Sequence, residues 1–267
     1  MHSQGFREAP ASSTEAYLPI ASYFSFSRAE NTERLQLSKG KLRSDSLHLR
    51  GIQLDVPPKI EALNAFTHPE TIQKSQRKKK IPMKTRQTPK NTLVLELEET
   101  LAVSSLTAHW EDASTFTVHF QGRHYKVSVK LRPHLEEFLE ELARIYEVFI
   151  FTAAKQDYAD KILKAFGPQR KLIRHQLYQE DCLCSQGCYI KDLSVLERDL
   201  ARTVAVANCL EAFPYQTSNV ILIPKWLGSP RDKELLRLIP VLKRLSQVDN
   251  ICAEIERKPH GKPTEEA

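Results

Sequence analysis

Four short apolar runs constrain this chain to an α/β fold. Each run is continuously apolar rather than alternating, which is typical of strands buried on both faces of a sheet. Amphipathic helical patterns lie between the runs. Because strands that alternate with helices pair in parallel, we expect a parallel central sheet flanked by helices. The runs are TLVLEL (92–97), YEVFIF (146–151), RTVAVAN (202–208) and NVILIP (219–224).

The segments between these runs predict helices and one insertion. Apolar residues at helical spacing follow Pro133, and a second helical pattern ends at Gly167. A third pattern covers 231–248, where Pro240 predicts a kink or a break. Alternating apolar and polar residues predict a small β-hairpin insertion within 114–131.

Composition divides the chain into three parts. Residues 1–90 carry 16 Lys and Arg against 8 Asp and Glu, whereas the remainder carries 23 against 25. The basic character therefore belongs to the first third, which also lacks sustained periodicity and is rich in polar residues. We expect a disordered basic tail at 1–84, one folded domain at 85–250 and a disordered C-terminal tail at 251–267.

The end of the basic tail carries a dense run of positive charge. The segment KSQRKKKIPMKTRQTPK (Lys74–Lys90) holds eight basic residues and no acid. Such a run predicts a nuclear import signal or a contact with an anionic surface, and the alternative is a solvated linker. No aromatic residues interleave with Arg77–Lys80, so nucleic-acid binding is not expected.

Composition also excludes several classes of protein. No run of about 18 apolar residues is present, so we expect no membrane span and no membrane partner. The N-terminus lacks the basic and apolar regions of a secretory signal. Five cysteines, an odd number, fit a reducing compartment with free thiols. Cys182, Cys184 and Cys188 lie close together, but no second Cys or His pair stands at zinc spacing. We therefore expect a nuclear or cytoplasmic protein.

Acidic and polar side chains follow the ends of the apolar runs. Glu96, Glu98 and Glu99 crowd the end of the first run, Thr152 follows the second and Asn208 closes the third. The carboxyl ends of parallel strands form one edge of a sheet, where open α/β proteins place their sites. The sequence therefore predicts that these residues meet in one site.

The stretch TLVLELEETL (92–101) resembles the LVLDLDETL signature of the small C-terminal-domain phosphatases, a family of the haloacid dehalogenase superfamily. The resemblance covers roughly Thr85 to Asn250 and implies a haloacid dehalogenase-like phosphatase domain. It also implies that the hairpin insertion lies beside the cleft as a protein-contact surface. The other matching stretches are VKLRPHLEEFLEELARIYEVFIFTAAKQDYADKIL (129–163), RHQLYQEDCLCSQGCYIKDLSVLERDL (174–200) and ELLRLIPVL (234–242).

The resemblance also implies a role for each site residue. In that family the first Asp of D-x-D is the nucleophile and the second is the general acid, and these positions fall on Glu96 and Glu98. The phosphate-binding Thr and Lys of the family fall on Thr152 and Lys191. A magnesium ion is held beside the nucleophile, which implies a vestigial magnesium site at Glu96 and Asn208.

Three departures from the family pattern fall on its chemical positions. Glutamate at 96 and 98 displaces each carboxylate by about one carbon–carbon bond, and a misplacement of ~1 Å can lower a rate ~100-fold. Ala207 stands where the family has an Asp beside the metal, and magnesium tolerates little departure from octahedral oxygen geometry. We therefore expect a catalytically impaired phosphatase-like domain that binds a protein partner, with a phosphoprotein as one option. The alternative is an active magnesium-dependent protein serine/threonine phosphatase.

Glu96 is expected to approach Lys191. An uncompensated carboxylate in a partly dry cleft is costly, so a nearby ammonium group stabilises it. The longer side chain of Glu96 would then lie where the family binds phosphate. The alternative is a plain ion pair with no function attached.

Overall fold

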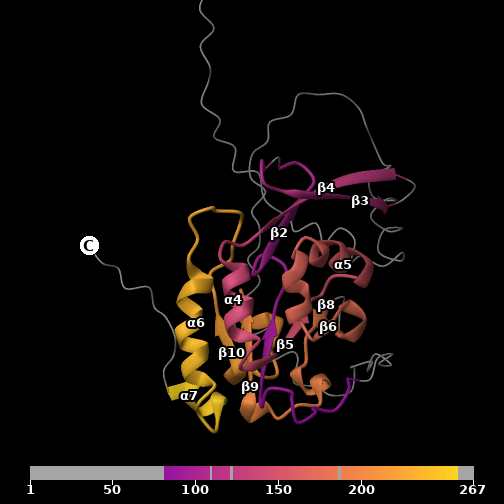
Figure 1. Cartoon of the computed structure of the whole chain (residues 1–267). Coiled ribbons are helices and arrows are strands. Elements are labelled where there is room, and N and C mark those ends of the chain that lie inside the picture. The colour runs from indigo at the N-terminus through magenta and orange to yellow at the C-terminus, as the bar shows by residue number, and fades with distance from the viewer. Residues whose placement is uncertain (1–80, 109, 121–122, 186–187, 258–267) are drawn as a thin grey trace, which may run out of the picture.

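The computed structural model describes residues 81–257, apart from 109, 121–122 and 186–187. Its centre is a five-stranded sheet in the order β10-β9-β1-β5-β6 (Figure 1), in which every pairing is parallel. The four predicted apolar runs form four of these strands, so the expected α/β class with a parallel central sheet is confirmed. The strands are β1 (Asn91–Leu95), β5 (Tyr146–Phe151), β6 (His175–Leu177), β9 (Thr203–Ala207) and β10 (Val220–Leu222).

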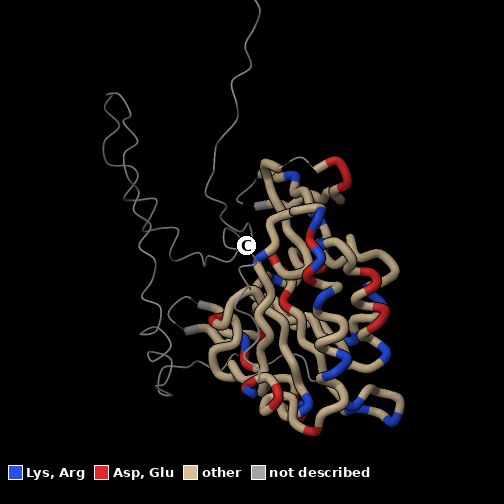
Figure 2. The backbone as a smooth tube through the Cα atoms, turned by 90° about the vertical axis from the view of Figure 1, so that its left-hand side faces the viewer, with Lys and Arg blue, Asp and Glu red and all other residues tan. Residues whose placement is uncertain are grey.

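One face of the central sheet is covered by α-helices. Leu93 and Val148 belong to this face, and they share one apolar core with buried residues of the four α-helices in the described part of the chain. Figure 2 shows charged residues spread over the helices, while the central strands are mostly free of them. No helix in the described part of the chain is long and apolar enough to cross a membrane. The helices are α4 (Leu135–Leu142), α5 (Gln156–Lys164), α6 (Glu234–Leu245) and α7 (Ile251–Arg257).

Short 3₁₀ helices and loops cover the opposite face of the sheet. Val94 and Phe149 point to this side and join a second core with Leu193 and Phe213. Successive residues of a strand face opposite sides, so the continuous apolar runs fill both cores. The 3₁₀ helices of the described residues are η2 (Gly167–Leu172), η3 (Gln179–Asp181), η4 (Leu193–Leu196), η5 (Leu200–Arg202), η6 (Leu210–Ala212) and η7 (Thr217–Asn219).

The predicted hairpin insertion is present and gains a third strand. β3 (Ser114–Phe120) and β4 (Arg123–Leu131) form the hairpin, and β2 (Ala102–Ser105) pairs with the other edge of β4. This small antiparallel sheet lies at the end of the molecule toward which β1 runs (Figure 1). A separate two-stranded ribbon, β7 (Leu183–Ser185) and β8 (Cys188–Ile190), leads to Lys191.

The folded part is longer at both ends than the predicted 85–250. Ile81 is only 4% exposed and belongs to the second core, so the fold begins inside the predicted tail. At the other end α7 occupies residues that were assigned to the C-terminal tail. Its Ile251 and Ile255 are buried in the main core, which gives this short segment the apolar contacts that stabilise a helix. The predicted disorder at 1–80 and 258–267 lies outside the described residues.

Pro240 does not break the last long helix. α6 continues through it from Glu234 to Leu245. Pro240 is exposed, so the carbonyl group that loses its partner there can face water. On the other side of the helix, Leu235 and Leu242 are fully buried and hold both halves against the core.

Candidate functional site

The carboxyl ends of three central strands gather the predicted site residues. Glu96 extends β1 by one residue, and its N–H donates to the Val206 carbonyl of β9 at 3.0 Å. Thr152 directly follows β5, and Asn208 directly follows β9. Lys191 comes from the loop after β8 and is far from Glu96 in sequence. Topology therefore brings together side chains that are more than 100 residues apart.

Glu96 and Lys191 form a buried ion pair, as expected from the sequence. The Lys191 Nζ donates to Glu96 Oε1 at 2.8 Å, and the two side chains are 5% and 10% exposed. Burial alone would lower the pKa of Lys191, but the Glu96 carboxylate outweighs it and raises that pKa above its ordinary value. The second oxygen of the carboxylate, Oε2, accepts the backbone N–H of Asn208 at 3.2 Å. Both oxygens of Glu96 are therefore engaged by nitrogen donors.

Glu98 lies beside this pair with a different set of contacts. Its Oε2 accepts the Thr152 hydroxyl at 2.6 Å, and that hydroxyl in turn accepts the Ala154 N–H at 2.9 Å. Its Oε1 is buried without a hydrogen-bond partner among the described residues. Burial raises the pKa of Glu98, and the hydrogen bond from Thr152 only partly opposes the effect. The surroundings of Glu98 therefore favour the protonated form of its carboxyl group.

The side chain of Asn208 binds the loop that follows β1, so it is not free to bind a ligand. Its Nδ2 donates to the Glu98 carbonyl at 3.0 Å and approaches Thr100 Oγ1 at 3.2 Å. A carbonyl oxygen can only accept, so the amide must present its NH₂ group there. Ala207 precedes it at the end of β9 and is fully buried. Its methyl group offers no ligand or charge at a position where the family pattern has a carboxylate.

The predicted magnesium ligands do not fit that ion in this arrangement. Magnesium requires a near-octahedral set of oxygen ligands. Both Glu96 oxygens face nitrogen donors instead, one of them a lysine ammonium, and Asn208 directs an NH₂ group at the loop. In the residues that the structure describes, no group of three or more His, Cys, Asp or Glu side chains could hold a metal ion. No chemical step is therefore assigned to a metal at this site.

Two ion pairs beside the site, one half-exposed and one largely buried, were not predicted from the sequence. Glu99 has a left-handed backbone with φ of 56°, and its Oε2 lies 2.6 Å from Lys225 Nζ. Arg132 is fully buried, pairs with Asp232 through two 2.8 Å contacts and donates to the Thr100 carbonyl at 3.0 Å. Arg132 directly follows β4, and the sequence analysis did not single it out. Nothing in the sequence identified its partner.

The cysteines near the site are poor candidates for chemistry. Cys182 is buried beneath Thr152, with its Sγ 3.8 Å from the Thr152 carbonyl, and burial raises its pKa to about 12. Burial also raises the pKa of the half-buried Cys209. A thiol that resists ionisation is a weak nucleophile and a weak metal ligand.

The parallel sheet and the carboxylates gathered at its carboxyl ends are the arrangement that the resemblance to the haloacid dehalogenase superfamily implies. The model of the NLI interacting factor-like phosphatase family matches residues 91–252. The chain belongs to this family, as the sequence predicted.

Related proteins carry phosphatase names. CTD small phosphatase-like protein 3 of Caenorhabditis elegans is 42% identical over 177 residues, which cover 66% of this chain and 62% of that protein. CTD small phosphatase-like protein 2 of Dictyostelium discoideum is 41% identical over 178 residues, covering 67% and 31%. Carboxy-terminal domain RNA polymerase II polypeptide A small phosphatase 2 of Mus musculus is 35% identical over 163 residues, covering 61% and 60%. The chain thus spans less than two thirds of each relative's own length.

Proposed function

We propose that this domain is a catalytically impaired member of the phosphatase family that binds a protein partner. One observation carries the proposal: both oxygens of Glu96, at the nucleophile position, accept hydrogen bonds from Lys191 and Asn208. An in-line attack needs a free carboxylate oxygen about 3–3.5 Å from phosphorus. Here the ammonium that would bind a substrate phosphate already neutralises the residue that would attack it.

Loss of the metal ligand set supports the same proposal. Transfer of a phosphoryl group depends on cations that neutralise the charge developing on its oxygens. Lys191 is occupied by Glu96, and Ala207 contributes no carboxylate. Positioning and electrostatic stabilisation are both weakened, and these effects supply nearly all of the catalysis in this reaction class.

An active magnesium-dependent protein serine/threonine phosphatase is the second candidate. It is favoured by the raised pKa of Glu98, because a protonated carboxyl beside Thr152 suits a general acid. It is also favoured by the phosphatase names of the relatives. It requires Glu96 to leave Lys191 before substrate and metal can bind.

The partner that we propose is a protein, with a phosphoprotein as the first class to test. The mouse relative's name refers to the carboxy-terminal domain of an RNA polymerase II polypeptide, which makes a nuclear phosphoprotein a reasonable partner class. Nuclear localisation would rely on Arg77–Lys80, which lies outside the described residues. Lys84 belongs to the fold instead, since its Nζ donates to the Pro89 and Lys90 carbonyls.

Phosphate release from an aryl phosphate in the presence of magnesium tests the proposal. The unmodified chain should release phosphate no faster than its Glu96→Ala variant. Glu96→Asp alone should not restore turnover, whereas a variant with Glu96→Asp, Glu98→Asp and Ala207→Asp should exceed both. Magnesium-dependent turnover that Glu96→Ala abolishes would overturn the proposal and favour the second candidate.

Localisation needs a separate test in cells. Replacing residues 77–80 with alanine should shift the protein from the nucleus toward the cytoplasm. An unchanged distribution would remove the import signal from the proposal without affecting the catalytic part of it.

A further inference from the structure

β3 is an edge strand whose outward backbone groups are available for pairing. The order of the small sheet is β2-β4-β3, so β3 pairs only with β4 in the described part of the chain. The register places Phe120 opposite Arg123, the last pair that joins β3 to β4. Along an antiparallel strand, residues bonded to the partner strand alternate with residues whose N–H and C=O groups point away from it. The Thr117 carbonyl accepts from Lys161 rather than from β4, so Thr117 and its second neighbours point away from β4. These outward residues are Thr115, Thr117 and His119.

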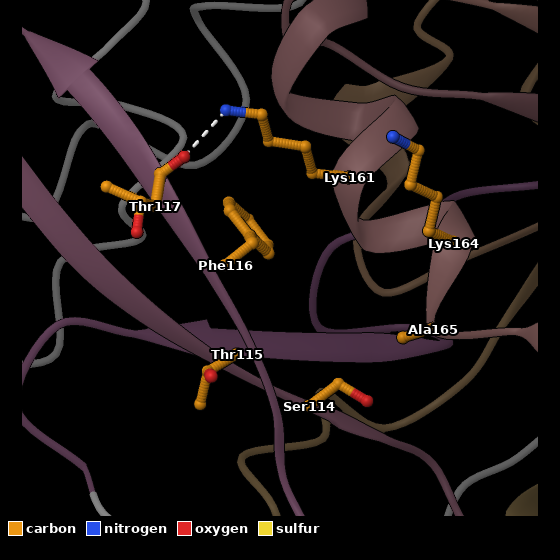
Figure 3. A pocket seen from close by; sticks show the side chains of 7 residues that line it. All are labelled: Ser114, Thr115, Phe116, Thr117, Lys161, Lys164 and Ala165. Atoms are coloured by element: carbon orange, nitrogen blue, oxygen red, sulfur yellow. Dashed lines mark hydrogen bonds between the residues drawn. The ribbon is translucent and has the colours of Figure 1, made fainter.

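One of these outward carbonyls has a partner on α5. The Lys161 Nζ from α5 donates to the Thr117 carbonyl at 2.7 Å (Figure 3), and its ammonium lies 5.7 Å from the centre of the Phe116 ring. A lysine that covers an exposed strand edge is a common means of preventing uncontrolled pairing. The contact is exchangeable, since a peptide N–H could replace the ammonium at the Thr117 carbonyl.

A groove of about 460 Å³ separates β3 from the second half of α5. It is open to solvent, and Figure 3 shows that Phe116 lies between the strand and the helix. Its position differs from that of the site around Glu96, because α5 begins next to that site and the groove starts more than a turn further along the helix. The lining residues are Ser114, Thr115, Phe116, Thr117, Lys161, Lys164 and Ala165.

The groove carries positive charge that is not neutralised locally. Lys161 and Lys164 line it, and no carboxylate is among the lining residues. Lys164 is exposed. Among the described residues, no carboxylate oxygen lies within 4 Å of its ammonium group. Asp160 on the same helix does not compensate, because it points to Arg170 at 2.7 Å and to the Tyr178 hydroxyl at 3.0 Å.

We infer that this groove binds an extended, acidic segment of a protein partner as an added strand on β3. The inference deepens the proposed function by naming the surface and the chemistry of the partner, and it rests on that function in treating the domain as a binding module. The segment's backbone pairs with the outward groups of Thr115, Thr117 and His119. Its carboxylates meet Lys164 and the ammonium of Lys161 that the added strand displaces.

Strand geometry sets the spacing of the acids. The outward edge from Thr115 to His119 spans roughly 13 Å at 3.3 Å per residue, which accommodates about five residues of peptide. Side chains of a strand alternate between faces, so only every second side chain faces α5. The partner segment therefore carries Asp or Glu at alternate positions, with uncharged residues between them.

Fluorescence polarisation with a labelled Glu-Val-Glu-Val-Glu-Val peptide tests the groove on the full chain. The Glu-Pro-Glu-Pro-Glu-Pro peptide has the same charge but cannot pair as a strand. It should bind at least about tenfold more weakly, as should the Lys-Val-Lys-Val-Lys-Val peptide. Equal binding of the Glu-Val and Glu-Pro peptides would show that binding depends on net charge and not on strand pairing, and would overturn the inference.

Two variants locate the binding on the protein. Lys164→Glu should weaken binding of the acidic peptide about tenfold or more, while Lys233→Glu makes the same change of charge on an exposed lysine outside the groove and should alter it less than about twofold. Thr117→Pro removes one outward N–H and should also weaken binding, with Thr115→Pro as the substitute if the first variant does not fold. Equal effects of the Lys164 and Lys233 changes would overturn the inference.

The outcomes separate the groove from the proposed function. Phosphate release is measured on the same preparations, and turnover by the unmodified chain would reject the proposed function while leaving the peptide result intact. Absence of peptide binding without turnover would reject the groove alone. Binding only of a phosphoserine peptide, lost in Lys191→Met, would place recognition at the site around Glu96 and overturn the groove.

Discussion

The two ends of the central sheet bury the same residue type in opposite ways. At the amino end, Glu147 of β5 is 2% exposed. It accepts hydrogen bonds from Arg198 Nε at 2.8 Å and Nη2 at 3.0 Å, pairs with His175 Nε2 at 2.9 Å, and lies 3.5 Å from Lys84 Nζ. At the carboxyl end, Glu98 accepts one side-chain hydrogen bond, from Thr152, and leaves Oε1 buried and unpartnered among the described residues.

The surroundings drive the two carboxyl groups to opposite protonation behaviour. Burial alone would raise the pKa of Glu147, but the hydrogen bonds from His175 and Arg198 outweigh it and lower the pKa to about 2. For Glu98, burial dominates and the pKa is raised. At the amino end of the sheet the contacts of Glu147 stabilise its ionised form. At the carboxyl end the ionised form of Glu98 is destabilised by burial, which is common at functional sites.

Removing the charge at the amino end should have the largest effect on stability. Glu147→Gln leaves Arg198 buried without its carboxylate, and loss of one partner of a buried pair destabilises by about 3 kcal/mol or more. Urea unfolding followed by circular dichroism measures the difference. Glu141→Gln is the control, because Glu141 pairs with Lys243 on the surface, and its variant should be indistinguishable from the unmodified chain. Similar midpoints for both variants would contradict the comparison.

Breaking the ion pair at the carboxyl end should have a smaller effect. Lys191→Met leaves the Glu96 carboxylate with the Asn208 N–H, so we expect destabilisation of about 2 kcal/mol. The double variant Lys191→Met with Glu96→Leu should recover part of this loss, because removing both charges also removes the cost of burying them. A double variant less stable than Lys191→Met alone would show that the pair is a net source of stability.

Acid should reduce the advantage of Glu147. Its folded pKa of about 2 lies below the ordinary value of 4.5, so its contribution is fully present above about pH 4.5 and is lost as the pH falls toward 2. The stability difference between the unmodified chain and Glu147→Gln should therefore shrink over that range. Unfolding midpoints at several pH values measure it, and a constant difference would refute the assigned linkage.

Neutralising Glu98 should have the smallest effect, with the opposite sign. Its pKa is raised, so the folded state favours the protonated form, and ionisation reduces stability as the pH rises above the ordinary value of 4.5. Relative to the unmodified chain, Glu98→Gln should gain stability with increasing pH, by less than about 1 kcal/mol. Marked destabilisation at pH 8 would mean that the ionised carboxylate is satisfied in a way that its contacts do not indicate.

The sequence predicted the strands of the central sheet well, because burial on both faces produces runs such as TLVLEL without alternation. It also predicted the pairing of Glu96 with Lys191, by matching motif positions and requiring a counter-charge. The Glu147 cluster was not predicted, although a single acid in the run YEVFIF indicated that some cation must meet it. Which cation meets it depends on how the loops carrying Lys84 and Arg198 return to the sheet.

The fold class, four strands of the central sheet and the meeting of Glu96, Thr152 and Asn208 at strand ends could be predicted from the sequence itself, because apolar periodicity and strand ends are local properties of the chain. Tertiary structure alone decided that Ile81 and α7 belong to the domain, that both oxygens of Glu96 are engaged, and that Lys161 covers the edge of β3. These features are contacts between residues distant in sequence. Their free energy depends on burial and on distances that only the assembled fold defines.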